Sequence, residues 1–176
     1  MVEMTDYSTE GIDIRRAMLR HVQAFPDRAR RPPYILWAGQ KVFTSYAIDV
    51  PSSGRVRLEF LSVPRVPRQG FDVKAEGGAI CLAGGEAVQT LRTWHDERYE
   101  GTVEYAYRSA ARRLIVWNVY EQEWPGGRVT EEKWTGNAGF VVDGDVERGL
   151  AFHCSHGPAR SPDFEQLVVR VVVSPG

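Results

Sequence analysis

The sequence predicts an all-β fold: an antiparallel β-sandwich of jelly-roll-like type with a short amphipathic helix at its N-terminus. Strand-length apolar runs recur from residue 34 to residue 173. Turn residues separate these runs at intervals of about 8–12 residues, which is typical of sandwiches and barrels. No helical segment long enough to connect parallel strands lies between them. A closed β-barrel is the alternative, because it gives the same spacing of strands and turns.

The N-terminal helix is predicted over residues 12–25. The residues that share its apolar face, spaced i, i+3, i+4, i+7, i+8 and i+11, are Ile14, Ala17, Met18, His21, Val22 and Phe25. Pro26 ends the helix because proline cannot continue it and biases the preceding residue towards an extended conformation. Residues 27–33 are predicted to form an irregular arm rich in arginine and proline.

The β-rich part is predicted to contain eleven strands. Their ranges are 42–50, 55–63, 71–75, 79–83, 86–94, 102–108, 112–121, 128–134, 137–143, 150–154 and 166–173. Val56, Leu58 and Phe60 alternate with charged residues, and Leu61 breaks this alternation, which predicts a β-bulge. The strand over 112–121 is apolar on both faces, so we expect it to be covered on both sides.

The length and composition indicate one domain, residues 1–176, with a sizeable core. Hydrophobic residues make up 43% of the chain, close to the globular average. We expect residues 1–33 to form a helical arm that packs on or caps a β core at 34–176. Cys81 and Cys154 are too few and too far apart to form a disulfide framework, so we expect buried thiols, with their pairing left open.

Charge and hydropathy exclude two classes of partner. The net charge is -1 and the isoelectric point is about 6.4, which gives no basic excess for nucleic-acid binding. The first 33 residues are locally basic, but Asp13 and Asp27 interrupt their arginines, which are therefore predicted to form a solvated helix face. These arginines are Arg15, Arg16, Arg20, Arg28, Arg30 and Arg31. No apolar run approaches the length of roughly 18 residues that a membrane span needs. The N-terminus has no basic stub followed by an apolar run, so we expect a cytoplasmic protein.

A histidine cluster near the C-terminus provides candidate metal ligands. Imidazole and carboxylate groups bind zinc-type ions, and the candidates are His153, His156 and Asp163. The two histidines converge only if the chain turns between them. The alternative is the end of a strand with polar histidines and a buried Cys154. A nucleophilic Cys154 is a further interpretation, although its neighbour His153 is expected on the opposite face. Apart from this metal, no cofactor is predicted.

Acid–base chemistry is a second hypothesis for the polar residues. His95 and Asp96 follow a strand, where loops often carry functional sites. The candidate catalytic residues are His95, Asp96, His153 and His156. They would act on a hydrophobic small molecule in a sandwich or barrel cavity, with the N-terminal helix as a lid. The alternative for His95 and Asp96 is a solvated loop.

Aromatic residues provide the broadest signal. A β-sandwich can line a surface with indole rings that stack on sugars or other flat ligands. The candidate ligand-binding residues are Trp94, Trp124, Trp134 and Asn137, the last in a run of small residues that permits close approach of a ligand. The alternative is that these rings fill the core.

The leading hypothesis from the sequence is a protein that binds a small organic or carbohydrate ligand on an aromatic-lined surface. The motifs of P-loop proteins, dinucleotide-binding folds, serine hydrolases and kinases do not occur in the sequence. An enzyme with a dispersed site is the second hypothesis. The third is a structural protein that forms a homo-oligomer through its helix or an exposed sheet edge.

Overall fold

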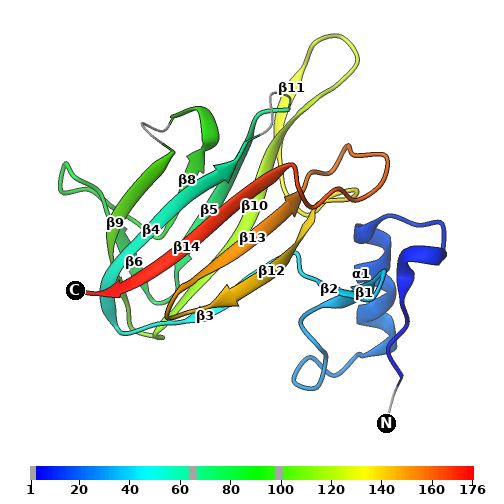
Figure 1. The fold of residues 1–176 in the computed structure, drawn as a ribbon, viewed down its shortest axis with the longest axis horizontal. Coiled ribbons are helices and arrows are strands. Elements are labelled where there is room, and N and C mark those ends of the chain that lie inside the picture. Colours follow the sequence, from blue (N-terminus) through cyan, green and yellow to red (C-terminus); the bar gives the residue numbers. More distant parts are fainter. Residues whose placement is uncertain (1–2, 64–66, 98–100) are drawn as a thin grey trace.

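The structure, a computed structural model, describes residues 3–63, 67–97 and 101–176. Two antiparallel sheets pack face to face, and the N-terminal helix lies at one end of the molecule, away from the C-terminus (Figure 1). Over the described ranges neither sheet closes on itself, so the fold is the predicted β-sandwich and not the alternative barrel. No helix in these ranges has both the length and the apolar character needed to cross a membrane.

The larger sheet has seven strands. Their order across the sheet is β12 (Gly139–Asp145), β13 (Gly149–Ser155), β14 (Leu167–Pro175), β4 (Ser53–Ser62), β9 (Thr102–Ser109), β6 (Gly78–Cys81) and β7 (Ala87–Val88). The predicted bulge is confirmed where β4 pairs with β14. Phe60 lies opposite Val169 and Ser62 opposite Val168, which leaves Leu61 without a partner.

The smaller sheet has five strands. They are β11 (Val129–Glu132), β10 (Arg113–Glu123), β5 (Gln69–Ala75), β8 (Thr90–Trp94) and β3 (Tyr46–Asp49). Both β3 and β11 pair with β10, β3 with its first part and β11 with its last. Leu114 and Val116 of β10 are inaccessible to solvent, and Trp117 on the opposite face is 6% exposed. As predicted, this strand is covered on both sides.

Two predicted strands are in fact interrupted where the chain crosses between the sheets. The predicted strand 42–50 breaks after Phe43, which bridges to β12 of the larger sheet, and β3 then joins the smaller sheet. The predicted strand 86–94 divides in the same way, because β7 pairs with β6 and β8 pairs with β5. The residues that pack on the core lie three positions apart across each crossing, Phe43 and Tyr46 at the first and Val88 and Leu91 at the second. The alternation therefore slips at both places, and the predicted strands ran through these slips.

Aromatic rings fill the space between the sheets. Phe152 of β13 lies at the centre, with ring centroids 5.3 Å from Phe71 of β5 and 5.3 Å from Phe140 of β12. All three side chains are inaccessible to solvent. Edge-to-face and tilted contacts at this distance add to the stabilisation from apolar burial. The core therefore lies between β5 and β10 on one side and β12, β13 and β14 on the other.

The N-terminal segment forms a second apolar cluster beside β12 (Figure 1). It contains the 3₁₀ turn η1 (Tyr7–Thr9), helix α1 (Ile14–Ala24) and the hairpin of β1 (Ile35–Trp37) and β2 (Gln40–Val42). The C-cap of α1 is Phe25, as the following proline predicts. The backbones of Phe43 and Phe140 exchange two hydrogen bonds of 2.9 Å, which attach this segment to the edge of the larger sheet.

Candidate functional site

A cleft of about 360 Å³ lies between the β10–β11 hairpin, the first turn of α1 and the loop that follows β13. We call it the hairpin cleft. Its lining residues are Arg15, Gln122, Trp124, Glu132, Thr135, Gly136, Gly157 and Pro158. The hairpin extends beyond the sandwich (Figure 1), and its residues Gln122, Trp124 and Glu132 form one wall of the cleft. The volume falls in the range of small-molecule sites, about 300–1,000 Å³.

Strand alternation determines which side chains of the hairpin reach the cleft. Tyr120 pairs with Glu132, and Gln122 pairs with Thr130, so these four residues share one face. Trp124 continues the same alternation one step further. Gly126 and Gly127 form the turn, with φ values of 90° and 81° that favour glycine. The hairpin therefore presents an aromatic, an amide and a carboxylate side chain to the same space.

The indole of Trp124 is held in place by hydrogen bonds within the hairpin. Its Nε1 donates to Thr130 Oγ1 at 2.7 Å, and that hydroxyl donates to Glu132 Oε1 at 2.9 Å. The Arg128 guanidinium lies 5.7 Å from the indole centroid. The ring and the carboxylate therefore have a fixed relative position, which is the pre-organisation that binding sites require.

Helix α1 brings a cation to the opposite wall. The Arg15 backbone N–H donates to the Gly136 carbonyl at 3.0 Å, and the Ile14 N–H donates to Asn137 Oδ1 at 3.2 Å. These contacts fix the start of the helix against residues 136–137. The Arg15 side chain is exposed, and within the described ranges its guanidinium forms neither an ion pair nor a hydrogen bond.

Two buried rings, those of Tyr120 and His156, lie behind the lining residues Thr135 and Gly157. The Tyr120 hydroxyl contacts the hydroxyl of Thr135 and its carbonyl, the latter at 3.2 Å, and the His156 ring centroid lies 6.2 Å from that of Tyr120. Burial raises the pKa of Tyr120. Burial also lowers the pKa of His156, with a smaller opposing effect from Asp163. Both groups are therefore neutral at neutral pH, and the charges of the cleft are those of Arg15 and Glu132.

Asn137, a predicted ligand-binding residue, connects three segments of the fold. Its Oδ1 accepts a hydrogen bond from the Ile14 backbone N–H, and its Nδ2 donates one to the Ala159 carbonyl at 2.8 Å. The side chain is 7% exposed. Asn137 thus holds the helix and the loop after β13 in the positions that form the cleft.

The other two predicted tryptophans lie elsewhere, on the outer face of the smaller sheet. Trp94 is 5% exposed because Arg68 and Arg92 lie over its ring, at 4.5 Å and 5.8 Å from the centroid. Trp134 is 42% exposed and packs against Trp117 with a centroid distance of 5.5 Å. The three predicted tryptophans therefore do not form one surface, and Trp124 alone lines the hairpin cleft.

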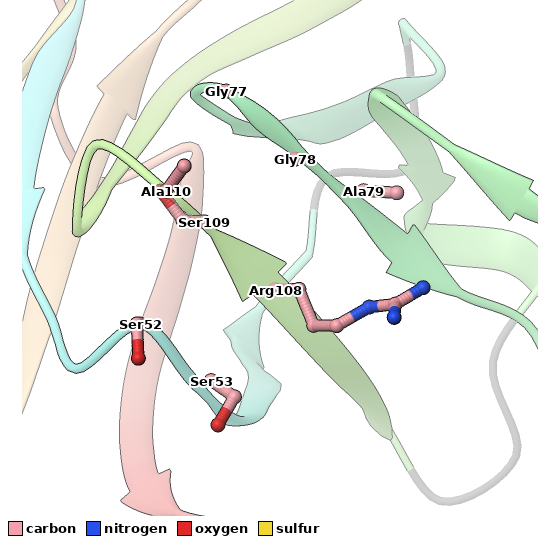
Figure 2. Close-up of a pocket in the computed structure, with 8 residues that line it drawn as sticks. All are labelled: Ser52, Ser53, Gly77, Gly78, Ala79, Arg108, Ser109 and Ala110. Carbon is pink, nitrogen blue, oxygen red and sulfur yellow. The ribbon is translucent and has the colours of Figure 1, made fainter.

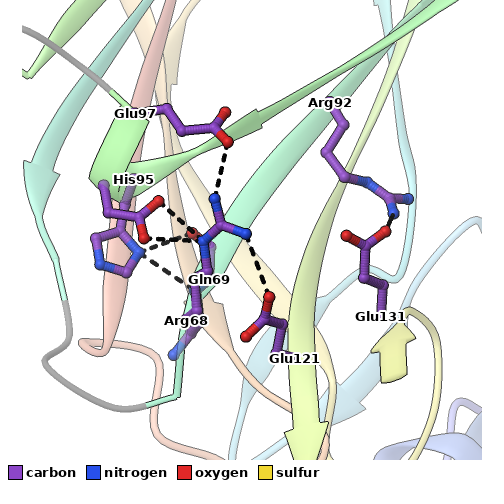
Figure 3. Close-up of polar contacts among 8 residues, drawn as sticks. Arg68, Gln69, Arg92, His95, Glu97, Glu121 and Glu131 are labelled. Carbon is purple, nitrogen blue, oxygen red and sulfur yellow. Dashed lines mark hydrogen bonds and ion pairs between the residues drawn. The ribbon is translucent and has the colours of Figure 1, made fainter. Parts of the chain in front are cut away.

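His95 and Asp96 belong to a polar network around Arg68 (Figure 3). The Arg68 Nε lies 2.9 Å from both carboxylate oxygens of Asp96. Further Arg68 nitrogens donate to Glu97 at 2.8 Å and to Glu121 at 3.2 Å. His95 Nδ1 lies 2.8 Å from the Gln69 carbonyl. Asp96 is thus paired with Arg68, and His95 contacts backbone.

The C-terminal histidines point in different directions. His153 Nδ1 lies 3.5 Å from Glu165, while the adjacent Cys154 is buried in the core. The Cys154 thiol contacts the Phe152 carbonyl at 3.6 Å, and burial raises its pKa, which disfavours the thiolate that a nucleophile requires. Cys81 and Cys154 are both free thiols.

The predicted metal ligands His153, His156 and Asp163 are not brought together. Among the described residues, no three His, Cys, Asp or Glu side chains lie close enough to hold a metal ion. The backbone N–H of Asp163 donates to Ser155 Oγ at 3.1 Å. The four acid–base candidates likewise occupy three separate places, and His156 alone lies beside the hairpin cleft.

A wider hollow of about 520 Å³ lies between the start of β4, the start of β6 and the end of β9 (Figure 2). Its eight lining residues are three serines, two alanines, two glycines and Arg108, which is the only charged side chain among those drawn. The Ser109 hydroxyl donates to the Glu76 carbonyl at 2.6 Å. This hollow has no aromatic side chain in its lining, so it offers less recognition chemistry than the hairpin cleft.

Comparisons with protein-family models, curated proteins and solved structures find no match. The site is therefore defined by its own residues. Sequence reasoning missed Arg15, Gln122 and Glu132. The sequence did contain a pattern that places Gln122. If the alternation of the predicted strand 112–121 is continued to Trp124, both Gln122 and Trp124 lie on the same face as Tyr120.

Proposed function

We propose that this protein binds a small organic or carbohydrate ligand in the hairpin cleft. The proposal is supported by the convergence of four kinds of recognition group. Trp124 offers an apolar ring for stacking, Gln122 an amide, Glu132 a carboxylate and Arg15 a guanidinium. Small-molecule sites combine apolar contact area with a few polar groups that orient the ligand.

The single observation that carries the proposal is the position of Trp124. Its ring lines the cleft, and its only polar atom is already bonded to Thr130. The indole N–H is therefore satisfied within the hairpin, and the ring, whose centroid lies 5.7 Å from the Arg128 guanidinium, is held in a fixed position beside the cleft. A stacked aromatic pair contributes about 0.5–1.5 kcal/mol beyond the effect of its buried area.

The experiment is a ligand screen read by two methods. A library of sugars and small organic molecules is tested by indole fluorescence and by saturation-transfer NMR on the full chain. For any ligand found, we expect Trp124→Ala to weaken binding by about tenfold or more, which corresponds to 1.4 kcal/mol. Trp134→Ala is the control, because that ring lies outside the cleft. Unchanged binding by Trp124→Ala, or the absence of any ligand, would overturn the proposal.

A further inference from the structure

We infer that the ligand of the hairpin cleft is a small zwitterion, with an anionic group that pairs with Arg15 and an ammonium group that contacts Trp124 and Glu132. This inference rests on the proposed function, because it names the class of ligand for the same site. It follows from the two charged residues that line the cleft and from the absence of an ion-pair partner for them among the described residues.

Arg15 and Glu132 are opposite charges that line one cleft without pairing with each other. Within the described residues, no ion pair or hydrogen bond joins them. Arg15 is exposed and has no partner there. Glu132 accepts one hydrogen bond, from the Thr130 hydroxyl at 2.9 Å, and its second oxygen accepts none from the described residues. A ligand that carries both charges would pair with both residues, whereas an ion of one sign would meet a like charge.

The aromatic residue is on the side of the carboxylate. Trp124, Thr130 and Glu132 form a hydrogen-bonded series within the hairpin, so the indole and the carboxylate belong to one rigid unit. An indole face attracts cations, and an aromatic ring beside a carboxylate is suited to an ammonium group. Arg15 comes from the helix on the other wall and is suited to a carboxylate or similar anion, because its guanidinium can form paired hydrogen bonds.

The buried residues behind the cleft lining add no competing charge. Tyr120 is inaccessible to solvent, and its hydroxyl is occupied by Thr135. His156 is 8% exposed. Neutral, buried groups behind the walls lower the local dielectric and strengthen the interaction of a ligand with the charges on the walls. The volume of about 360 Å³ is near the lower end for ligand sites, which suits a molecule of amino-acid or betaine size.

The test uses four probes of nearly equal shape. Glycine betaine carries both charges, choline only the ammonium, 3,3-dimethylbutyrate only the carboxylate and 3,3-dimethylbutanol neither. Dissociation constants are measured by calorimetry and NMR titration. We expect betaine to bind about tenfold or more tightly than each of the other three. Its carboxylate adds charge-assisted hydrogen bonds to Arg15, and its trimethylammonium group, which has no N–H, adds electrostatic and cation–π contact with Glu132 and Trp124.

Variants assign each charge to its residue. We expect Arg15→Gln to make the dissociation constants of betaine and choline equal. We expect Glu132→Gln to make those of betaine and 3,3-dimethylbutyrate equal. The matched controls are Arg16→Gln on the same helix and Glu123→Gln on the same hairpin, both exposed and outside the lining. Neither control is expected to change the order of the probes.

Two results would overturn the inference and leave the proposed function standing. In the first result, 3,3-dimethylbutanol binds as tightly as betaine, and the Trp124→Ala variant binds neither compound. The other is that a neutral library ligand depends on Trp124 while none of the charged probes binds. A betaine preference that persists in both charge variants would also overturn the inference. Absence of binding by the probes and by the whole library would overturn the proposed function as well.

Discussion

The Asp72 carboxylate accepts two hydrogen bonds from the Arg92 guanidinium, at 2.9 Å and 2.8 Å, although its side chain is only 2% exposed. Arg92 also donates to Glu131 at 2.7 Å (Figure 3). A nearly buried carboxylate depends on such a partner, because a charge without one is costly in a poorly hydrated environment. This ion pair connects β5 and β8 with β11, and so supports the base of the projecting hairpin.

Loss of this arginine should destabilise the protein strongly. Arg92→Met leaves the Asp72 carboxylate buried and unpaired, and we expect a loss of about 3 kcal/mol in the free energy of unfolding. The matched control is Arg55→Met, which breaks an exposed pair with Glu104 of 2.9 Å. That change should cost less than about 1 kcal/mol. Equal effects in chemical denaturation would contradict the assigned role of Asp72.

The base of the hairpin cleft leaves no space for a side chain at Gly157. A Cβ there would contact the Tyr120 hydroxyl and lie 2.8 Å from the Thr135 carbonyl. We therefore expect Gly157→Ala to lower the free energy of unfolding by about 1–3 kcal/mol. Gly84→Ala is the control, because a Cβ at that glycine meets no atom within 4 Å. Equal unfolding midpoints for the two variants would show that Gly157 does not form this base.

His156 should give the stability a pH dependence. Burial lowers its pKa below the ordinary value of 6.5, so the unfolded chain binds a proton more readily than the folded one. The free energy of unfolding should therefore rise with pH between the folded and unfolded pKa values, and fall as the solution is acidified below about pH 6.5. His156→Gln should flatten this part of the profile. Urea denaturation between pH 5 and pH 8 measures it, and identical slopes would refute the assignment.

Asp6 should titrate at unusually low pH. Its pKa is lowered from 3.8 to about 2 by hydrogen bonds from the Ser8 side chain and from the Gly39, Ser8 and Ala38 backbones. The Ala38 and Gly39 N–H groups donate at 3.0 Å and 2.8 Å, which ties the N-terminus to the β1–β2 hairpin. This stabilisation is present above the ordinary pKa and is lost as the pH falls through about 2.

Carboxyl NMR shifts measure this titration directly. Asp6→Asn should also accelerate amide exchange of Ala38 and Gly39, because their acceptor loses its charge. Exchange at Phe152, in the centre of the sandwich, serves as the internal control and should not change. A carboxyl that titrates near 3.8, with unchanged exchange at Ala38 and Gly39, would show that this contact is not formed.

Local patterns predicted much of the fold, because the features concerned lie within single segments. The apolar stripe and Pro26 define α1, and the interrupted alternation at Leu61 predicts the bulge in β4. The crossings at Phe43 and Gln89 were not predictable in this way. At each crossing the core-facing residues are three positions apart, as Phe43 and Tyr46 are, but a bulge within one sheet gives the same slip in the alternation. The residue pattern therefore did not show that the strand changes sheets.

The candidate site was harder to predict because it depends on contacts between distant segments. Trp94 is covered because Gly70, its partner on β5, has no side chain and Arg68 lies over the indole. Arg15 was correctly expected on the solvated face of the helix. Its role as a wall of the cleft arises from Gly136 and Asn137, which fix the helix start from more than a hundred residues away.

The most direct test of the central claim is an NMR titration of the tryptophan indole N–H signals, assigned by replacing each tryptophan in turn. The chain has five tryptophans, which serve as reporters in different places. With glycine betaine or a ligand from the library, we predict that the Trp124 signal shifts in a saturable manner, while those of Trp94 and Trp117 stay constant. A saturable shift at Trp134 with an unchanged Trp124 signal would place the ligand on the outer face of the smaller sheet and contradict the assignment to the hairpin cleft.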